Sequence, residues 1–324
     1  MKEEQDTLLH IFYCLENQNQ PVSMDSIKRN LSWSGNISLV AEDEIKRLIE
    51  KGYLTTENDN IFSLTDIGRN EAYKASRIMV KNEFDKKVTR LTGSRTYLDY
   101  CEEVYGYRMY LFNMMDKEQL DFIINSVYIS PQDKILDLGC GTGNVLNTLC
   151  SKYNCKGIGI DQLSNGVVEI NSKMITYIDG DIDRLSDYDI KPSITIAVDS
   201  LYFSSDLDKL IQQLISIRNN RLFLFYSQYV LDESAVDRSM LQRDKTRLAE
   251  VLDKNCVSYE TIDYSGNEAL LYEKSIKALL KYKKAFENEG NLDLFENKLR
   301  EDMGGKEIYS KGLAKRYLYI VNRK

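Results

Sequence analysis

A single histidine, His10, and the absence of any C-x-x-C pair limit the metal chemistry of this 324-residue chain. The six cysteines are scattered along it, at positions 14, 101, 140, 150, 155 and 256. Structural zinc sites use closely spaced Cys and His ligands, so this pattern argues against a metal site. It favours reduced, mostly buried thiols and hence a cytoplasmic protein.

Long apolar runs and an excess of positive charge are also missing. No segment approaches the roughly eighteen apolar residues that a membrane-spanning helix needs. The opening MKEEQDTLLHIFYCLEN is acidic, and its apolar run is too short for a signal peptide. The formal net charge is −7, so no general basic field attracts nucleic acid or an anionic membrane. We therefore expect neither a membrane nor a nucleic acid as partner.

The length favours two domains, and 43% hydrophobic with 29% charged residues is typical of globular chains. Residues 1–80 have the pattern of three amphipathic helices, a hairpin and a further helix. Ser23 and Thr65 are expected N-caps. Gly52 is an expected helix end, and residues 57–60 are the expected hairpin turn. This succession resembles the small winged-helix (α+β) domain of bacterial regulators.

Residues 81–130 are predicted to form a helical linker that caps the cofactor, and they are rich in tyrosine. Tyr97, Tyr100 and Val104 recur at helical spacing. Two interpretations stay open for this stripe: packing under the next domain, or a tyrosine that caps a ligand pocket. Tyr97 is the candidate cofactor contact.

From residue 131 onward, short apolar strands alternate with helical segments. The strand candidates are KILDLG, KGIGID, MITYID, SITIAVDS, RLFLFYS, VSYETID and RYLYIV. Each of the first five is followed by an expected helix, which is the pattern of a parallel sheet covered on both faces. Residues 131–324 are therefore predicted to form a Rossmann-like α/β sandwich of seven strands, with a long insert at about 265–312 before the last strand.

The first of these strands runs into a glycine-rich turn, KILDLGCGTGNV, in which Asp137 precedes Gly139, Gly141 and Gly143. A dinucleotide fold uses G-x-G-x-x-G so that a helix N-terminus receives a pyrophosphate. Here the spacing is G-x-G-x-G, and a carboxylate at the strand end would repel a phosphate. S-adenosylmethionine carries a sulfonium and an ammonium and no phosphate, so it suits the acid better. The glycines let the backbone approach its methionine part closely.

Further acids end the next strands, and the carboxyl edge of a parallel sheet brings such residues together. Asp161, with Gln162 beside it, can accept hydrogen bonds from the ribose hydroxyls of either ligand class. Asp181 and Ile182 suit the exocyclic amine and the flat face of an adenine. Asp199 ends the fourth strand at the same crevice. One such acid alone could be a helix cap, but their recurrence beside a glycine turn favours a ligand site.

The motifs ILDLGCGTG, GID, GDIDRL and AVDSLYF, in this order and spacing, resemble the class I S-adenosylmethionine-dependent methyltransferases. The resemblance covers roughly residues 95–324 and points to the bacterial small-molecule type. It implies a seven-stranded sheet, bound S-adenosylmethionine and methyl transfer. It leaves the acceptor open.

Methyl transfer from a sulfonium is an in-line displacement, so an enzyme mainly has to align the acceptor and exclude water. A base is needed only if the acceptor must first lose a proton, and His10 lies in the other domain. An amine that is neutral on desolvation needs no strong base, so we expect N-methylation rather than O-methylation of a small molecule. Tyr202 and, second, Tyr226 are the candidates for orienting the acceptor, although either could pack in the core or at the rim.

The insert at about 265–312 is expected to cover the acceptor pocket as a lid. Within it, Glu268, Tyr272 and Glu289 are candidates for reading an amine. A solvated amphipathic helix would carry the same charges, so two interpretations stay open for these three residues.

A winged helix also allows a second function, that of a transcriptional regulator whose methyltransferase-like domain senses S-adenosylmethionine or another metabolite. Residues 1–80 hold nine Lys and Arg against thirteen Asp and Glu. Acids occupy the start of the expected recognition helix, at residues 42–44, and the wing tip, at Glu57 and Asp59. DNA binding depends largely on phosphate neutralisation. We therefore favour a unit that forms a homodimer or roofs the pocket.

Overall fold

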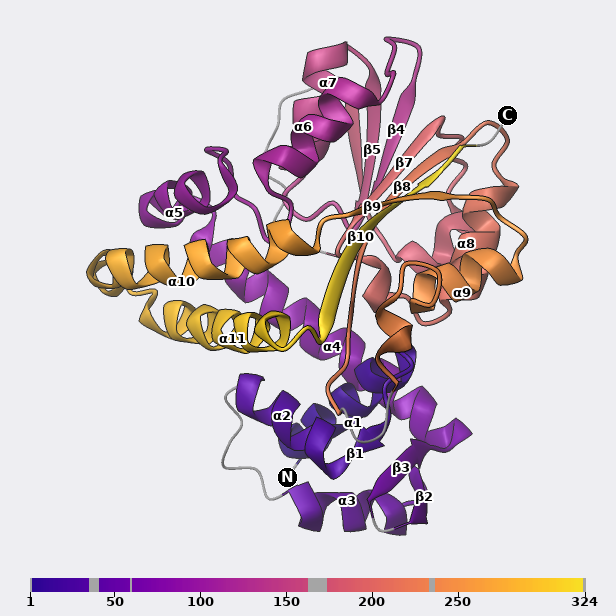
Figure 1. The fold of residues 1–324 in the computed structure, drawn as a ribbon, viewed down its shortest axis with the longest axis vertical. Helices are drawn as coiled ribbons and strands as arrows, with labels where there is room; N and C mark the ends of the chain where they lie inside the picture. The colour runs from indigo at the N-terminus through magenta and orange to yellow at the C-terminus, as the bar shows by residue number, and fades with distance from the viewer. Residues whose placement is uncertain (1, 35–40, 59, 163–173, 233–236, 323–324) are drawn as a thin grey trace.

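The computed structural model describes residues 2–34, 41–58, 60–162, 174–232 and 237–322. Two β-sheets organise it, one of three strands near the N-terminus and one of seven strands (Figure 1). The α-helices are α1 (Lys2–Asn17), α2 (Met24–Ser34), α3 (Ala41–Glu50), α4 (Asp66–Leu91), α5 (Arg95–Tyr105), α6 (Lys117–Ser126), α7 (Asn144–Tyr153), α8 (Leu207–Ser216), α9 (Arg247–Lys254), α10 (Ser265–Asn288) and α11 (Leu292–Ser310). Short 3₁₀ helices are η1 (Ile182–Asp187), η2 (Leu201–Phe203) and η3 (Arg238–Leu241). None of the described helices has both the length and the apolarity that a bilayer crossing requires.

The large sheet contains all seven expected strands, in the order β6-β5-β4-β7-β8-β10-β9. They are β4 (Lys134–Leu138), β5 (Lys156–Asp161), β6 (Ile175–Asp179), β7 (Ile194–Val198), β8 (Arg221–Tyr229), β9 (Glu260–Asp263) and β10 (Ala314–Val321). Strands β4 to β8 pair in parallel, whereas β10 runs antiparallel to both of its neighbours. The prediction of a Rossmann-like α/β sandwich is confirmed. The helix expected after β5 falls on residues 163–173, which lie outside the described residues.

Alternating side chains of the central strands pack on opposite faces of this sheet. In β8, Phe223 and Phe225 belong to the core under α6 and α7. Leu222, Leu224 and Tyr226 belong to the core under α8 and α9. Successive strand residues point to opposite faces, so a strand covered on both sides needs an apolar run without polar interruptions. Figure 1 shows helices on both sides of the sheet.

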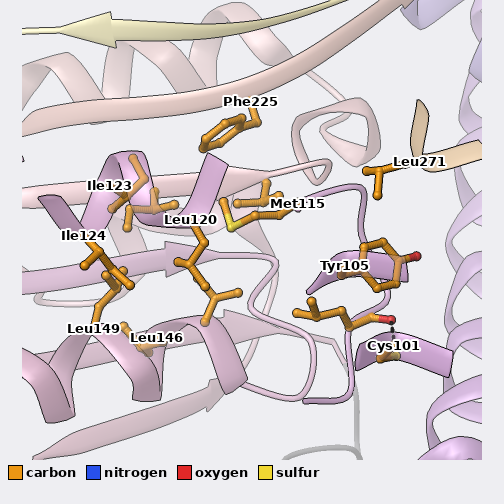
Figure 2. Packing of buried hydrophobic residues seen from close by; sticks show 14 of the residues in the cluster. Cys101, Tyr105, Met115, Leu120, Ile123, Ile124, Leu146, Leu149, Phe225 and Leu271 are labelled. Atoms are coloured by element: carbon orange, nitrogen blue, oxygen red, sulfur yellow. Dashed lines mark hydrogen bonds between the residues drawn. The ribbon is translucent and has the colours of Figure 1, made fainter. Parts of the chain in front are cut away.

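Figure 2 shows part of the first of these cores. Leu120 and Ile123 of α6 lie in one cluster with Leu146 and Leu149 of α7 and Phe225 of β8. All five side chains are almost fully buried. This packing anchors the first turns of α7, and so it fixes the glycine turn that directly precedes the helix.

The tyrosines of α5 lie in the same core. Tyr97, Tyr100 and Tyr105 are each at most 5% exposed, and the rings of Tyr97 and Tyr100 stack with their centroids 5.5 Å apart. Packing under the next domain therefore describes these three side chains. Tyr110, in the loop between α5 and α6, lines the pocket described below.

The N-terminal unit, residues 2–64, packs three helices against a small sheet. Its strands are β1 (Val22–Ser23), β2 (Leu54–Asn58) and β3 (Ile61–Leu64), in the spatial order β1-β3-β2. The expected caps are present: Thr65 accepts a hydrogen bond from the third residue of α4 (3.0 Å), and Ser23 accepts one from the Ser26 N–H (3.1 Å). Gly52, just past α3, has a left-handed φ of 71°. Asp59, of the expected wing tip, lies outside the described residues.

Helix α4 starts at the N-terminal unit and continues unbroken from Asp66 to Leu91. The expected domain boundary at residue 80 therefore falls inside a continuous helix. No glycine or proline occurs between Arg69 and Thr92, so nothing in this part of the sequence stops the helix. In Figure 1 the helix extends from the N-terminal unit toward the large sheet.

Buried polar contacts dock the N-terminal unit on the end of β8. The Gln20 side-chain amide donates to the Tyr229 carbonyl (2.7 Å) and accepts from the Leu231 N–H (3.2 Å). Ser23 donates to the Asp232 carboxylate over 2.5 Å. Because buried polar groups are costly unless they are paired, these contacts fix the orientation of the unit on the sheet.

The expected insert forms a helical hairpin, α10 followed by α11, between β9 and β10. The two helices run side by side (Figure 1). Helix α10 packs against α5, and α11 packs against α2. The hairpin thus connects the N-terminal unit to the helices beside the large sheet.

Candidate functional site

A pocket opens at the carboxyl ends of the parallel strands, which is where ligands bind in such sheets. It holds about 1070 Å³ of empty space, its open mouth included. Its lining comprises residues 110–113, residues 139–142, Asn144 and Val145, then Asp161, Gln162, Gly180, Ile182, residues 198–200 and Phe203. A separate part, which we call the α1/α4 wall, comprises Tyr13, Ser76, Arg77, Val80, Lys81 and Phe84. Six of the twelve predicted site residues line the pocket: Gly139, Gly141, Asp161, Gln162, Ile182 and Asp199.

The three glycines of the turn all have left-handed φ values, 70°, 52° and 76° in chain order, which L side chains rarely adopt. A methyl group on Gly139 would meet Ser200 Cβ at 2.4 Å, and one on Gly143 would meet the Tyr177 hydroxyl at 2.3 Å. A methyl group on Gly141 would meet no atom of the described residues within 4 Å. Gly139 and Gly143 thus permit close packing, whereas Gly141 faces the open space of the pocket.

The backbone N–H groups at the three glycines are already engaged within the protein. Gly139 and Cys140 both donate to the Ile160 carbonyl, at 2.8 and 3.2 Å, and Gly143 donates to the Cys140 carbonyl at 2.8 Å. Gly141 donates to the Asp161 carboxylate at 2.8 Å. A bound pyrophosphate needs free N–H groups. Here the Asp161 carboxylate takes the Gly141 N–H, and its negative charge makes the turn a poor phosphate site.

Asp137, the second-last residue of β4, is 4% exposed and does not itself line the pocket. Burial, together with the negative charge of nearby Asp161, raises the pKa of Asp137 to about 7. A cation in the pocket would favour the ionised form of both acids. The two side chains therefore make the turn end of the pocket electronegative.

Asp199 lines the pocket, but its charge is already paired. Its carboxylate accepts two hydrogen bonds from the Arg316 guanidinium, at 2.5 and 3.1 Å, and one from the Met114 N–H at 2.8 Å. Arg316, on β10, is fully buried and also lies 3.7 Å from Glu268. Sequence reasoning missed Arg316, and no sequence signal distinguishes it from Lys315, its basic neighbour on β10.

Asp181 is also paired, and it does not line the pocket. It accepts a hydrogen bond from the Asp183 N–H (2.9 Å), which caps η1, and forms an ion pair with Arg77 (2.8 Å). Arg77 belongs to the α1/α4 wall, so this ion pair joins the wall to the loop after β6. Ile182 is 7% exposed and does line the pocket. Of the two residues predicted at the adenine, only Ile182 faces the ligand space.

The three candidate tyrosines lie behind the lining. The Tyr202 hydroxyl accepts the Ser227 N–H (2.6 Å), and its ring centroid is 4.8 Å from that of Tyr226. Tyr226 is 1% exposed in the core under α8 and α9. The Tyr97 hydroxyl donates to the Leu111 carbonyl (2.5 Å). Tyr97 thus supports the loop of residues 110–113, which does line the pocket.

The candidates in the insert also lie outside the lining. Glu268 accepts hydrogen bonds from the hydroxyls of Tyr272 (3.2 Å) and Tyr309 (2.7 Å). Glu289 accepts hydrogen bonds from the N–H and the hydroxyl of Thr96, at 3.1 and 2.6 Å, at the start of α5. Glu268 therefore links α10 to α11, and Glu289 links the hairpin to α5.

The α1/α4 wall is the part of the site that sequence reasoning missed. Phe84 packs edge-to-face on Phe203, with ring centroids 6.4 Å apart. Lys81 donates to the Gln162 carbonyl over 2.5 Å. The uninterrupted helical sequence after Thr65 is the signal for a helix long enough to make these contacts.

The single histidine contacts the α1/α4 wall from the side that faces away from the pocket. His10 Nδ1 is 3.0 Å from Ser76 Oγ, and Ser76 lines the pocket. Burial lowers the pKa of His10 to about 4, so its ring is neutral at pH 7. Because the imidazole itself does not line the pocket, this placement favours a packing role.

The mostly parallel seven-stranded sheet, with a glycine turn after β4, the third strand in spatial order, is the fold of S-adenosylmethionine-dependent methyltransferases. The chain is similar to the cyclopropane synthase MmaA2 from Mycobacterium tuberculosis, with a TM-score of 0.58 and 11% identity, over 74% of this chain and 98% of that one. It is also similar to phosphoethanolamine N-methyltransferase 2 from Haemonchus contortus, with a TM-score of 0.57 and 12% identity, over 82% of this chain and 62% of that one. At such low identity the likeness establishes the fold alone.

Two comparisons of sequence each match a part of this chain. Residues 119–223 match the family described as Methionine biosynthesis protein MetW. A stretch of 68 residues is 34% identical to malonyl-[acyl-carrier protein] O-methyltransferase from Priestia megaterium. That match spans 19% of this chain and 25% of the relative's length, so it does not transfer the relative's substrate to this chain.

The variants Gly139→Ala and Gly141→Ala should show which glycine is needed for close packing and which one faces the open pocket. Both changes put a side chain at a left-handed φ, which costs about 1–2 kcal/mol. Only the first also forces a methyl group into Ser200. We expect the urea midpoint of unfolding to fall further for Gly139→Ala than for Gly141→Ala. Equal losses of stability in the two variants would contradict this assignment.

The raised pKa of Asp137 predicts a pH dependence of stability. The folded state keeps the Asp137 proton up to about pH 7, whereas the unfolded chain releases it near the ordinary value of 3.8. Between these values the folded state binds more protons at Asp137, so the contribution of this residue to the free energy of unfolding should fall as pH rises, by up to roughly 1.4 kcal/mol per pH unit, and level off above pH 7. Urea unfolding of the wild type and of Asp137→Asn at a series of pH values measures this contribution as the difference between their slopes. Asp137→Asn should remove it, and an unchanged slope in that variant would disprove the assignment.

Proposed function

We propose that the protein is an S-adenosylmethionine-dependent methyltransferase that acts on a small molecule. The observation that carries the proposal is the turn after β4, where Asp161 occupies the Gly141 N–H and the other glycine N–H groups are engaged. The carboxylates of Asp161 and Asp137 thus place negative charge at the turn, and this charge disfavours a phosphate there. A ligand with a sulfonium and an ammonium suits such a site, and a pyrophosphate does not. The fold shared with the N-methyltransferase structure supports the proposal.

The lining residues fit this cofactor part by part. Gly141 leaves open space in which a methionine moiety can approach the backbone. Asp161 presents a carboxylate for ribose hydroxyls with Gln162 beside it, and Ile182 offers an apolar face to adenine. When bound, S-adenosylmethionine supplies an electrophilic methyl group. The other predicted cofactor residues would act from behind the lining or by shaping it: Tyr97, Asp137, Gly139, Gly143, Asp181 and Asp199.

We propose N-methylation as the favoured transfer, to an acceptor that needs no strong base. No histidine lines the pocket among the described residues, and His10 is separated from it by Ser76. Tyr202 would then act through Ser227 and Asp199 as a positioning residue, and Tyr226 through its contact with Tyr202. An acceptor that is methylated on a carboxylate oxygen also needs no base, because the carboxylate is already ionised.

Carboxylate O-methylation is therefore the second candidate. The match to malonyl-[acyl-carrier protein] O-methyltransferase favours it, because that relative's name specifies transfer to oxygen. The name of the Haemonchus contortus enzyme specifies transfer to nitrogen. The two names thus disagree about the acceptor atom, and only the product can decide between them.

We propose that the N-terminal unit is a winged-helix domain that roofs this pocket. Its element order α1-β1-α2-α3-β2-β3 supports the first part, and Tyr13 of α1 in the pocket lining supports the second. Acids at residues 42–44 begin α3, which disfavours the regulator as an alternative. Homodimerisation through this unit stays a prediction, for light scattering to measure. Sequence-selective binding in a low-salt mobility-shift assay would support the regulator instead.

Replacing Asp161 should weaken the binding of S-adenosylmethionine and S-adenosylhomocysteine. Asp161→Asn keeps the shape but removes the charge that strengthens hydrogen bonds to the ribose, so we expect about a tenfold or greater rise in Kd by titration calorimetry. Asp189→Asn is the matched control, because its side chain is 95% exposed and lies outside the pocket lining. It should bind like the wild type. A wild type that binds NAD avidly and neither adenosyl compound would overturn the proposed function.

Labelled cofactor should identify the acceptor atom. The protein is incubated with a cell extract and S-adenosylmethionine labelled in its methyl group, and the products are analysed by mass spectrometry. We expect N-methylated amines as the labelled products, with Asp161→Asn as the control of low activity. Labelling confined to carboxylates, alcohols or phenols would refute N-methylation while leaving methyl transfer in place.

A further inference from the structure

A buried hydroxyl without a partner lies in the α1/α4 wall. Tyr13 is 4% exposed and lines the pocket, and its hydroxyl has no hydrogen-bond partner among the described residues. Burying a hydroxyl unpaired is unfavourable. Its position at the edge of a ligand pocket points to a partner that the ligand supplies.

The neighbours of Tyr13 place it at one end of the pocket. Its ring centroid is 5.9 Å from that of Tyr73, whose hydroxyl donates to the Asp181 carboxylate at 3.4 Å. One turn further along α1, Asn17 donates to the Ser204 carbonyl at 3.3 Å. Tyr13 therefore lies beside the loops that follow β6 and β7. These loops carry the apolar face that we assign to adenine.

The acid predicted to read adenine is committed elsewhere. Asp181 caps η1 and forms an ion pair with Arg77, and it does not line the pocket. A carboxylate held by a guanidinium and a backbone N–H is a poor partner for an exocyclic amine that it does not face. The base end of the pocket therefore needs another polar group, and Tyr13 offers one.

We propose that the Tyr13 hydroxyl hydrogen-bonds the polar edge of the adenine of S-adenosylmethionine, so that the N-terminal unit completes the cofactor site. The inference rests on the proposed function, because it takes S-adenosylmethionine as the ligand. A phenol hydroxyl accepts as well as donates, so it can accept a hydrogen bond from the exocyclic amine. Ile182 then contacts the face of the base while Tyr13 reads its edge.

Titration calorimetry with S-adenosylhomocysteine tests the inference in the full-length protein. Tyr13→Phe keeps the ring and removes only the hydroxyl, and we expect it to weaken binding about five- to tenfold. Tyr317→Phe is the matched control, because its buried hydroxyl donates to the Leu241 carbonyl (2.9 Å) and its ring lies outside the pocket lining. The control should bind like the wild type. The ligand-free Tyr13→Phe variant should melt at or above the wild-type temperature, so weaker binding would not reflect unfolding.

An analogue separates the base edge from the rest of the ligand. The analogue of S-adenosylhomocysteine that carries hydrogen in place of the 6-amino group removes the partner of the Tyr13 hydroxyl, and the wild type should bind it more weakly than S-adenosylhomocysteine. In Tyr13→Phe this preference should shrink. Equal affinity of wild type and Tyr13→Phe for S-adenosylhomocysteine, or an unchanged preference between the ligands, would overturn the inference and leave the proposed function standing. A wild type that binds neither ligand would overturn both.

Discussion

A buried cation, Arg316, imposes the arrangement of side chains at the ligand edge of the sheet. Its guanidinium is fully buried and stays charged, so acceptors must surround it. They come from four elements: Asp199 after β7, Ser227 of β8, Gln119 of α6 and Glu268 of α10. Removing one partner of a buried ion pair typically costs about 3–5 kcal/mol. Because Asp199 also holds the Met114 N–H, the same cation fixes the loop that leads into the pocket wall.

Ion pairing decides which acids give the pocket its charge. Asp199 is neutralised by Arg316 and Asp181 by Arg77. The remaining negative charge comes from Asp161 and from Asp137, whose pKa of about 7 leaves it half ionised at neutral pH. Both lie at the glycine turn. Selection for a positively charged ligand therefore acts at this end of the pocket, where the methionine part is expected, and not along the whole crevice.

The fold could be predicted because the strands β4 to β7 are short, largely apolar runs, and each of them ends in an acid or is directly followed by an acid or a glycine. Residues at or just beyond strand ends, such as Asp161 and Ile182, could be predicted as lining because the strand ends of a parallel sheet converge. The position of Tyr226 could not be predicted in this way. One step along a strand changes the face to which a side chain points, and no local sequence pattern fixes that face. Tyr13 and Arg77 depend on how the N-terminal unit docks. A long-range contact of this kind leaves no periodicity in the sequence.

Helix α4 connects the N-terminal unit to the cofactor site without a hinge. Arg77 and Lys81, one turn apart, bind the loops after β6 and β5, which flank the end of the pocket that we propose for adenosine. A displacement of the N-terminal unit must therefore move both loops, because no glycine or proline interrupts the helix between them and Thr92. A ligand that contacts both Tyr13 and Asp161 binds more tightly when the N-terminal unit is docked. By linkage, the bound ligand stabilises the docked position of the unit by the same free energy. On the proposed ligand contacts, this coupling gives the N-terminal unit a role that requires neither DNA nor a second copy of the chain.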